Sequence, residues 1–220
     1  AIQCDTRGGL LSQGKELIRM KATLMIQEYI AGDDTSVEFY MFYRSADGIT
    51  IQGCTGRKIR QIPPGAGIMA SGESLWLPHI AEISDRFLRS LDYRGIGGIE
   101  YKRYKGKSYF IEINVRTESC NSLAAGAGMD LAWYAYLDIA LNRMPRERVQ
   151  QKKRYYLIGQ AYRNLILSHR QGFPAFMEML KFIFSGKTRY SLWYYRDPIP
   201  WLMLLPYDRF WLKIKSFFKR

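Results

Sequence analysis

The sequence lacks the features that define several common protein classes. No window reaches about 18 uninterrupted apolar residues, and the first residues do not form a secretory signal, so we expect neither a membrane-spanning helix nor export. The three cysteines, Cys4, Cys54 and Cys120, are widely spaced and odd in number, which argues against a disulfide framework. None has metal-ligand spacing to another cysteine or to either histidine. These absences favour a globular cytoplasmic protein.

Acidic residues are scarce in the last third of the chain. Residues 151–220 hold 14 Lys and Arg residues against three acidic ones, a net charge of +11, so only +2 of the formal +13 belongs to residues 1–150. The same segment holds 17 of the 32 aromatic residues. No recognised nucleic-acid motif accompanies this charge, so a nucleic acid is not the expected partner. The change in composition predicts a domain over residues 1–145 and a basic, aromatic extension over residues 146–220.

Local patterns predict an α+β fold whose first part is antiparallel sheet with flanking helices. Spacing and turn signals predict a helix at residues 14–20, a strand at 24–30 and a hairpin at 36–43 with 49–54, closed by an Asp-Gly turn. A glycine- and proline-rich loop follows at 61–72, which we expect to be mobile. The remaining elements are a helix at 78–91, a second hairpin at 98–103 with 108–115, and a helix at 131–141. Further helices are predicted near residues 155–166 and 173–184.

The second hairpin carries candidate metal ligands. Residues two apart on a strand point to one face, so Glu112 and Asn114 share a face, with Phe110 in register beneath them. If residues 105–107 form a three-residue loop, Glu100 lies directly opposite Glu112, with the two carboxylates roughly 5 Å apart. Facing carboxylates need a compensating charge, and a hard cation such as Mg²⁺, or alternatively Mn²⁺, supplies it.

A two-residue loop is the alternative for this hairpin. It shifts the register by one position and leaves both glutamates as ordinary exposed strand residues.

Two stretches in this hairpin resemble motifs of the ATP-grasp enzymes. YFIEINVR at residues 109–116 is similar to their F-I-E-x-N-x-R strand, and GGIEY at residues 97–101 is similar to their G-x-x-E-[FY] strand. The resemblance implies that Glu100, Glu112 and Asn114 hold one or two Mg²⁺ ions between the β- and γ-phosphates of ATP. It also implies that Arg116 neutralises charge on the transferred phosphoryl group.

An upstream stretch, MIQEYIAGDD at residues 25–34, is similar to the hinge that lines the adenine pocket in the same enzymes. The resemblance assigns the hinge to Gln27, Glu28, Tyr29 and Ile30, with the carbonyl of Gln27 and the amide of Ile30 reading the adenine edge. It assigns the ribose hydroxyls to Asp34, since a carboxylate accepts from both.

A third stretch, CTGRKIRQ at residues 54–61, resembles a segment of bacterial ATP-grasp carboligases. It implies that Arg57, Lys58 and Arg60 face one cleft and bind phosphate or an anionic substrate, with Lys58 and Arg116 as the catalytic pair. The alternative is a solvated basic strand end. Glu73 either contacts substrate or caps the segment after it.

The resemblance covers roughly residues 1–145 and lacks the family's upstream lysines, so the chain is expected to be an N-terminally truncated ATP-grasp domain. Arg7, Gly8 and Gly9 are then candidates to approach phosphate. The implied function is ligation of a carboxylate to an amine or thiol through an acyl phosphate. A nucleotide-binding or membrane-peripheral scaffold without turnover is the alternative.

The aromatic and basic extension leaves two interpretations open. Its rings either pack against the ATP-grasp core or lie at a membrane interface, where lysines meet anionic lipid.

Overall fold

The computed structural model describes residues 2–65, 67–143, 150, 153–159, 161–162, 172–191 and 196–199. Contacts within the chain divide it into two compact units, Ala1–Ala31 and Gly32–Arg220. The first unit consists of helix α1, Arg7–Arg19, followed by residues without regular structure. The helix begins earlier than predicted because the hydroxyl of Thr6 caps it by accepting a hydrogen bond from the Gly9 amide at 3.1 Å. Arg7 to Gly9 therefore form a helical turn rather than a loop.

The strand predicted over residues 24–30 is wrong. These residues form no strand, and Met25, Ile26 and Tyr29 are exposed. A strand needs a neighbour to satisfy its backbone N–H and C=O groups. Among the described residues of the first unit, α1 is the only regular element, so this apolar segment has no partner there.

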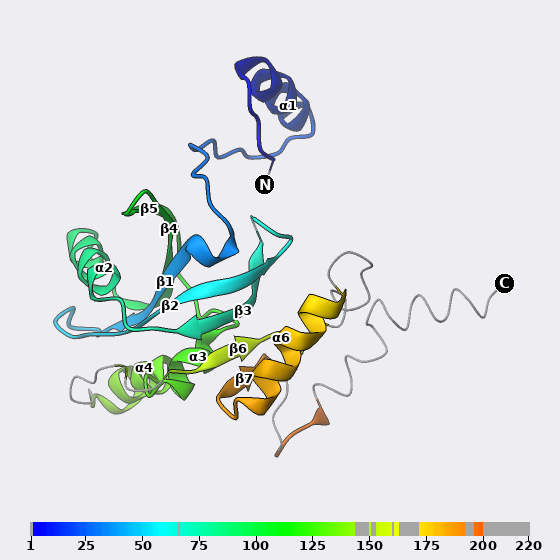
Figure 1. The fold of residues 1–220 in the computed structure, drawn as a ribbon. Coiled ribbons are helices and arrows are strands. Elements are labelled where there is room, and N and C mark those ends of the chain that lie inside the picture. Colours follow the sequence, from blue (N-terminus) through cyan, green and yellow to red (C-terminus); the bar gives the residue numbers. More distant parts are fainter. Residues whose placement is uncertain are drawn as a thin grey trace. The chain divides into compact units, whose positions relative to one another are not determined.

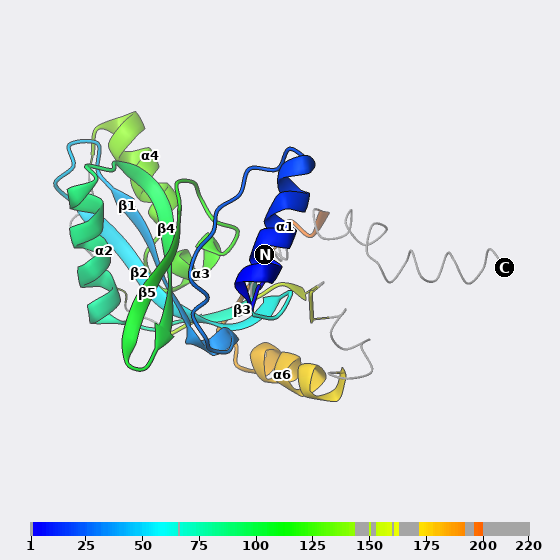
Figure 2. The ribbon, with the colours of Figure 1, turned by 90° about the horizontal axis from the view of Figure 1, so that it is seen from above.

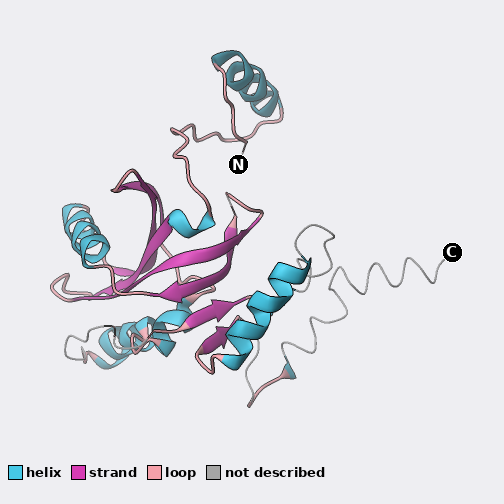
Figure 3. Ribbon diagram, viewed as in Figure 1, coloured by secondary structure: helices cyan, strands magenta, loops and turns pink. Residues whose placement is uncertain are grey.

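The second unit is built on a seven-stranded sheet in the order β5-β4-β1-β2-β3-β6-β7, antiparallel except for β6 with β7 (Figures 1 and 3). The predicted α+β class with an antiparallel sheet is confirmed. The strands are β1 Val37–Arg44, β2 Ile51–Ile62, β3 Ile68–Ser74, β4 Gly95–Tyr104, β5 Lys107–Asn114, β6 Tyr155–Leu157 and β7 Thr188–Tyr190. The short 3-10 helix η1, Asp34–Ser36, leads into β1.

Strand β1, which lies between β4 and β2, is buried along its whole length because helices cover both faces of the sheet. Phe39, Met41 and Tyr43 pack on one face with α3, Asn121–Gly126, and α4, Leu131–Leu141. The alternate residues Tyr40 and Phe42 pack on the other face with α2, Pro78–Ser90 (Figures 1 and 2). The bounds predicted for the helix at 131–141 and the start predicted for the helix at Pro78 are confirmed.

The glycine- and proline-rich stretch 61–72 is largely regular, contrary to the prediction of a loop. Strand β2 continues through Ile62 and β3 begins at Ile68, so only the intervening turn is irregular. Gly72 lies inside β3, where a Cβ atom would stand 2.2 Å from the sulfur of Met69. That glycine serves close packing rather than a loop.

The extension contributes two strands and a helix to the same unit. Residues 155–157 form β6 on the edge of β3 rather than the predicted helix, since backbone pairing with Ser71 to Glu73 wins over local helical preference. Tyr156 packs with the α3 and α4 core, while Tyr155 and Leu157 face α6, Gly172–Phe184, which confirms the helix predicted there. The boundary near 145 and the apolar residues 201–218 lie outside the described residues.

Within the described residues, no helix has the length and apolar character needed to cross a bilayer.

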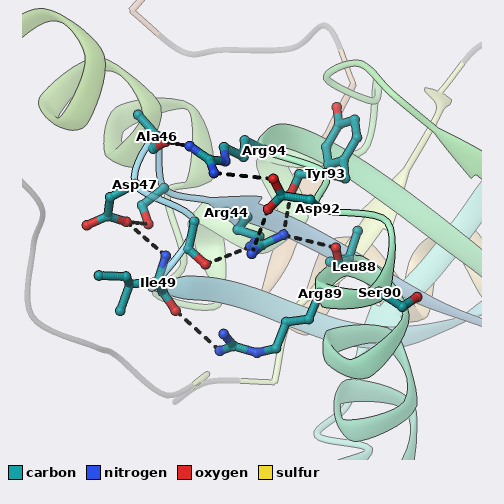
Figure 4. A network of polar contacts seen from close by, with 12 residues as sticks. Arg44, Ala46, Asp47, Ile49, Leu88, Arg89, Ser90, Asp92, Tyr93 and Arg94 are labelled. Atoms are coloured by element: carbon teal, nitrogen blue, oxygen red, sulfur yellow. Dashed lines mark hydrogen bonds and ion pairs between the residues drawn. The ribbon is translucent and has the colours of Figure 1, made fainter.

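A buried arginine joins the first hairpin to the end of α2. Arg44 donates to the carbonyl of Gly48 at 2.9 Å and to those of Leu88 and Tyr93 at 3.0 Å, and it pairs with Asp92 at 3.3 Å (Figure 4). The guanidinium thus satisfies carbonyls at the C-terminal end of a helix, where positive charge is favourable.

Two neighbouring arginines extend this network. Arg94 donates to the carbonyl of Ala46 at 2.8 Å and Arg89 to that of Ile49 at 3.2 Å (Figure 4). Three arginines therefore hold the Asp-Gly turn against the α2–β4 connection.

Replacing Arg44 by Met should lower the free energy of unfolding by about 3 kcal/mol, since buried carbonyls and Asp92 lose their partner. Urea unfolding measures the change. Arg86→Met is the matched control, because the Arg86 side chain is 71% exposed and forms a long, 3.9 Å surface ion pair with Glu82. We expect this change to alter the free energy of unfolding by less than about 0.5 kcal/mol. Equal losses in both variants would show that the Arg44 contacts add nothing.

Candidate functional site

The β4–β5 hairpin places Glu100 opposite Glu112 by a route that its sequence did not suggest. The turn is the two-residue alternative, Lys105-Gly106, because Tyr104 pairs with Lys107. A β-bulge between Glu100 and Tyr101 then adds one residue to β5, which restores the pairing of Glu100 with Glu112. The predicted facing of the two glutamates is confirmed, although the predicted three-residue loop is wrong.

The same bulge moves Phe110 to the other face of the sheet. Phe110 pairs with Tyr101, and its ring centroid lies 5.3 Å from that of Phe87 on α2. The prediction that Phe110 lies beneath Glu112 and Asn114 is wrong for this reason. One extra residue inverts the alternation, so the apolar ring and the acidic groups face opposite ways.

Glu100 is paired with a buried lysine on β2. The Nζ atom of Lys58 lies 2.7 Å from Oε2 of Glu100, and the two side chains are only 4% and 15% exposed. Burial raises the pKa of the Glu100 carboxyl, and the positive charge of Lys58 opposes that rise. Glu118 and Glu112 add to the rise because they are negative and near.

Lys58 also belongs to a longer polar chain. Its ammonium donates to Oε1 of Gln61 at 3.1 Å, and Nε2 of the same glutamine donates to Oδ1 of Asp34 at 3.0 Å. The chain Asp34–Gln61–Lys58–Glu100 thus connects two residues that were assigned from motifs far apart in the sequence. Side chains from η1, β2 and β4 meet there on one side of the sheet.

The exposed end of the site is held by Asn114. Its Nδ2 atom donates to Glu112 at 3.1 Å and to Glu118 at 3.2 Å, so the amide bridges two carboxylates. Glu118 fits here because Gly98, on the facing strand, has no side chain. A Cβ at Gly98 would lie 2.1 Å from a carboxylate oxygen of Glu118.

Carboxylates and an amide are the oxygen ligands that a hard divalent cation takes, so the donor set fits Mg²⁺ in kind. In this arrangement, however, Lys58 holds Glu100, and Asn114 turns its nitrogen rather than its oxygen toward the carboxylates. No group of three or more His, Cys, Asp or Glu side chains is gathered for a metal in the part of the chain that the structure describes.

The three cations expected in one cleft have separate partners. Arg57 pairs with Glu73 at 2.6 Å, whereas Lys58, next to it in β2, pairs with Glu100. Arg60 pairs with Glu178 of α6 at 2.5 Å. Neighbouring strand residues point to opposite faces, and the irregularity around residue 59 turns Arg60 toward α6. The expectation that all three face one cleft is therefore wrong.

Glu73 forms two ion pairs, a role that the sequence did not suggest. It lies between Arg57 and Lys153, the latter at 2.8 Å, and these hydrogen bonds lower the pKa of its carboxyl although burial alone raises it. The group lines a cavity of about 370 Å³ together with Tyr155 and Phe182. This cavity lies on the side of β2 opposite Lys58.

Asp34 is already engaged in the turn between β2 and β3. Its carboxylate accepts from the amides of Gln61 and Gly65, both at 2.8 Å, as well as from the Gln61 side chain. These contacts attach the turn between β2 and β3 to the start of η1. They give Asp34 a structural role that the hinge motif did not indicate.

The remaining candidates belong to other segments of the chain. Gln27, Glu28, Tyr29 and Ile30 belong to the first unit, in the segment without regular structure. Arg116 is exposed after the end of β5 and donates to the carbonyl of Thr117 at 3.3 Å.

No family model and no curated protein matches the sequence. Among solved structures, the chain is similar to the biotin carboxylase domain of a thermophilic 2-oxoglutarate carboxylase bound to bicarbonate. The identity is 15% and the TM-score 0.50, over 69% of this chain and 37% of that chain. The compared part has the ATP-grasp fold. Identity of this size shows the fold alone.

Two other ATP-grasp structures match less of the chain. A biotin carboxylase complex with β-γ-ATP from Campylobacter jejuni gives 17% identity and a TM-score of 0.47, over 55% of this chain and 28% of that one. The phosphoribosylaminoimidazole carboxylase ATPase subunit from Aquifex aeolicus gives 18% and 0.44, over 55% and 36%. The chain thus spans between 28% and 37% of the length of these three structures.

Three residues in or near this polar cluster were not predicted from the sequence. Gln61 and Glu118 connect the predicted residues to one another, and Lys102 is a buried lysine that donates to the Asp33 carbonyl at 3.2 Å. Burial lowers the pKa of Lys102. Lys102 could have been found, because it lies two residues from Glu100 on a strand and thus on the same face.

Replacing Asp34 by Asn should lower the free energy of unfolding by about 1–2 kcal/mol, since an amide has one accepting oxygen where the carboxylate has two. Chemical denaturation in the absence of nucleotide measures this change. Glu82→Gln, at a side chain 71% exposed, is the control and should stay within about 0.5 kcal/mol of the parent. If Asp34→Asn is equally neutral, the turn does not depend on this carboxylate.

Proposed function

We propose that this chain is the nucleotide- and metal-binding part of an ATP-dependent ligase that joins a carboxylate to an amine. The observation that supports this proposal best is the polar chain from Asp34 through Gln61 and Lys58 to Glu100. It connects the residue expected at the ribose with the residue expected at the metal, within an ATP-grasp fold. Two independent motif resemblances thus converge on one side of one sheet.

The carboxylates next to the bulge suit the phosphate end of the nucleotide. Glu100, Glu112 and Asn114 would hold Mg²⁺, which neutralises phosphate charge when it is bound. Asn114 would present its amide oxygen to the metal, and Glu118 would orient the amide by accepting a hydrogen bond from its nitrogen. Arg116, exposed beside the same strand end, would stabilise the negative charge of the transferred phosphoryl group.

The hinge residues would supply the adenine contacts. Backbone groups of Gln27 and Ile30 would read the adenine edge, and Glu28 and Tyr29 would line the pocket. This role suits a segment whose backbone has no strand partner of its own. A ribose hydroxyl would reach Asp34 by replacing one of the hydrogen bonds from the turn.

In the proposed reaction, the substrate carboxylate oxygen attacks the γ-phosphorus of ATP, and ADP leaves. The acyl phosphate that forms is attacked by the amine nitrogen, which displaces phosphate and loses a proton. Catalysis rests on positioning and on charge stabilisation. Arg57 and Arg60 pair with Glu73 and Glu178, away from Glu100. We therefore assign the anion contact on the Glu100 side of β2 to Lys58.

Glu112→Gln should separate a metal ligand from a structural glutamate. In metal-free protein the change relieves repulsion from Glu100, so stability should stay equal or rise by a few tenths of a kcal/mol. Mg·ATP should stabilise the parent by about 2.7 kcal/mol when its concentration is 100 times the dissociation constant, and the variant by much less. Thermal melts with and without Mg·ATP measure both effects.

Glu82→Gln, an exposed change on α2, should keep the full gain from Mg·ATP. Equal gains in the parent and in Glu112→Gln would show that the metal assignment is wrong. Absence of any gain in the parent would contradict nucleotide binding by this chain. ADP release with a panel of carboxylates and amines then separates a ligase from a scaffold that binds nucleotide without turnover.

A further inference from the structure

The ammonium of Lys58 has a complete set of partners within the protein. It donates to Glu100 at 2.7 Å, to Gln61 at 3.1 Å and to the carbonyl of Gly67 at 3.3 Å. An ammonium has three donors, and each of these has an acceptor. A lysine arranged in this way is held in place, since its side chain is only 4% exposed.

Lys58 pairs with a carboxylate that also feels the negative charge of two other glutamates. Glu100 lies near both Glu112 and Glu118, which raise the pKa of its carboxyl through their negative charge. A buried carboxylate is costly unless a positive charge or several donors compensate it. Lys58 supplies that charge at Glu100, and the amide of Asn114 supplies donors to Glu112 and Glu118. All three acids are therefore compensated without a metal ion.

The same lysine contacts the turn between β2 and β3. Gly67 belongs to this turn, and Gln61 at its start is hydrogen-bonded to both Lys58 and Asp34. A movement of Lys58 away from Glu100 therefore breaks contacts to the turn at its two ends. The position of the β2–β3 turn and the ion pair of Glu100 are therefore coupled through the side chain of Lys58.

We propose that Lys58 is an exchangeable internal counter-ion. Its ammonium stays paired with the Glu100 carboxylate until a divalent cation binds together with nucleotide phosphate. On entry, the metal takes the place of the ammonium at Glu100, and the ammonium moves to the phosphate. The turn contacts at Gly67 and Gln61 are released in the same step. This inference rests on the proposed function, and it adds that a free cation competes poorly for the site because the ammonium is tethered at high effective concentration.

Binding of Mn²⁺ alone tests the exchange without nucleotide or turnover. Free Mn²⁺ is measured by its EPR signal at about pH 8, where carboxyl groups are ionised. Lys58→Met should bind Mn²⁺ at least about tenfold more tightly than the parent, since no tethered ammonium competes. Mn²⁺ alone should also raise the melting temperature of Lys58→Met more than that of the parent.

Arg57→Met is the matched control, because Arg57 is the preceding residue of β2 and pairs with Glu73 on the other side. Its Mn²⁺ affinity should equal that of the parent. The double variant Lys58→Met with Glu100→Gln covers the case in which the single variant does not fold. It removes both charges, should recover a cooperative melt, and should bind Mn²⁺ no better than the parent.

Equal Mn²⁺ affinity in the parent and in a folded Lys58→Met protein would overturn the proposal, as would a double variant that is no more stable than the single one. Failure of the proposed function gives a different result, namely no stabilisation of the parent by Mg·ATP. Loss of Mg·ATP binding in Lys58→Met, with tighter Mn²⁺ binding, is the outcome that the exchange requires.

Discussion

The bulge between Glu100 and Tyr101 is the local constraint on which the arrangement of the candidate site depends. A two-residue turn by itself pairs Glu100 with Ile111 and leaves Glu112 on the face that α2 covers. The extra residue in β5 instead places Phe110 against Phe87, while Glu112 and Asn114 face the opposite side with Glu100. Apolar burial and acidic clustering are thus both satisfied by one irregularity, because strand alternation has a period of two.

Two buried cations show two ways in which this fold accommodates charge. Arg44 donates mainly to backbone carbonyls at the end of α2, and its acidic partner Asp92 is itself largely exposed. Lys58 is paired with Glu100, a carboxylate that is itself buried. The Arg44 arrangement holds backbone segments together and contains no buried carboxylate that a metal ion could take over. The Lys58 arrangement holds an ion pair in a low-dielectric region, where a competing ion changes the balance strongly.

The extent to which sequence predicts this protein differs between its parts. The helix at residues 131–141 and the Asp-Gly turn follow from periodicity and turn chemistry. The facing of Glu100 with Glu112 was predicted through a three-residue loop, whereas the structure reaches it through a two-residue turn and a bulge. The strand expected at 24–30 and the first residues of the helix expected near 155–166 failed, since strands depend on partners that local sequence does not contain. Residues 159, 161 and 162, later in the same predicted helix, are helical. Arg57, Lys58 and Arg60 were expected to face one cleft, but strand alternation and an irregularity in β2 direct them to three different acids.

By itself, the sequence determined which oxygen-bearing and cationic residues this protein has available, and in which order they lie along two hairpins. It also determined the α+β class, because apolar alternation with turn signals specifies strands and 3.6-residue periodicity specifies helices. Only the tertiary structure decided that Asp34, Gln61, Lys58 and Glu100 form one chain, and that Asp34 is engaged by the neighbouring turn. The contacts of Asp34 with Gln61 and of Lys58 with Glu100 join residues 27 and 42 positions apart, and the packing of β1 between β2 and β4 brings Lys58 and Glu100 together.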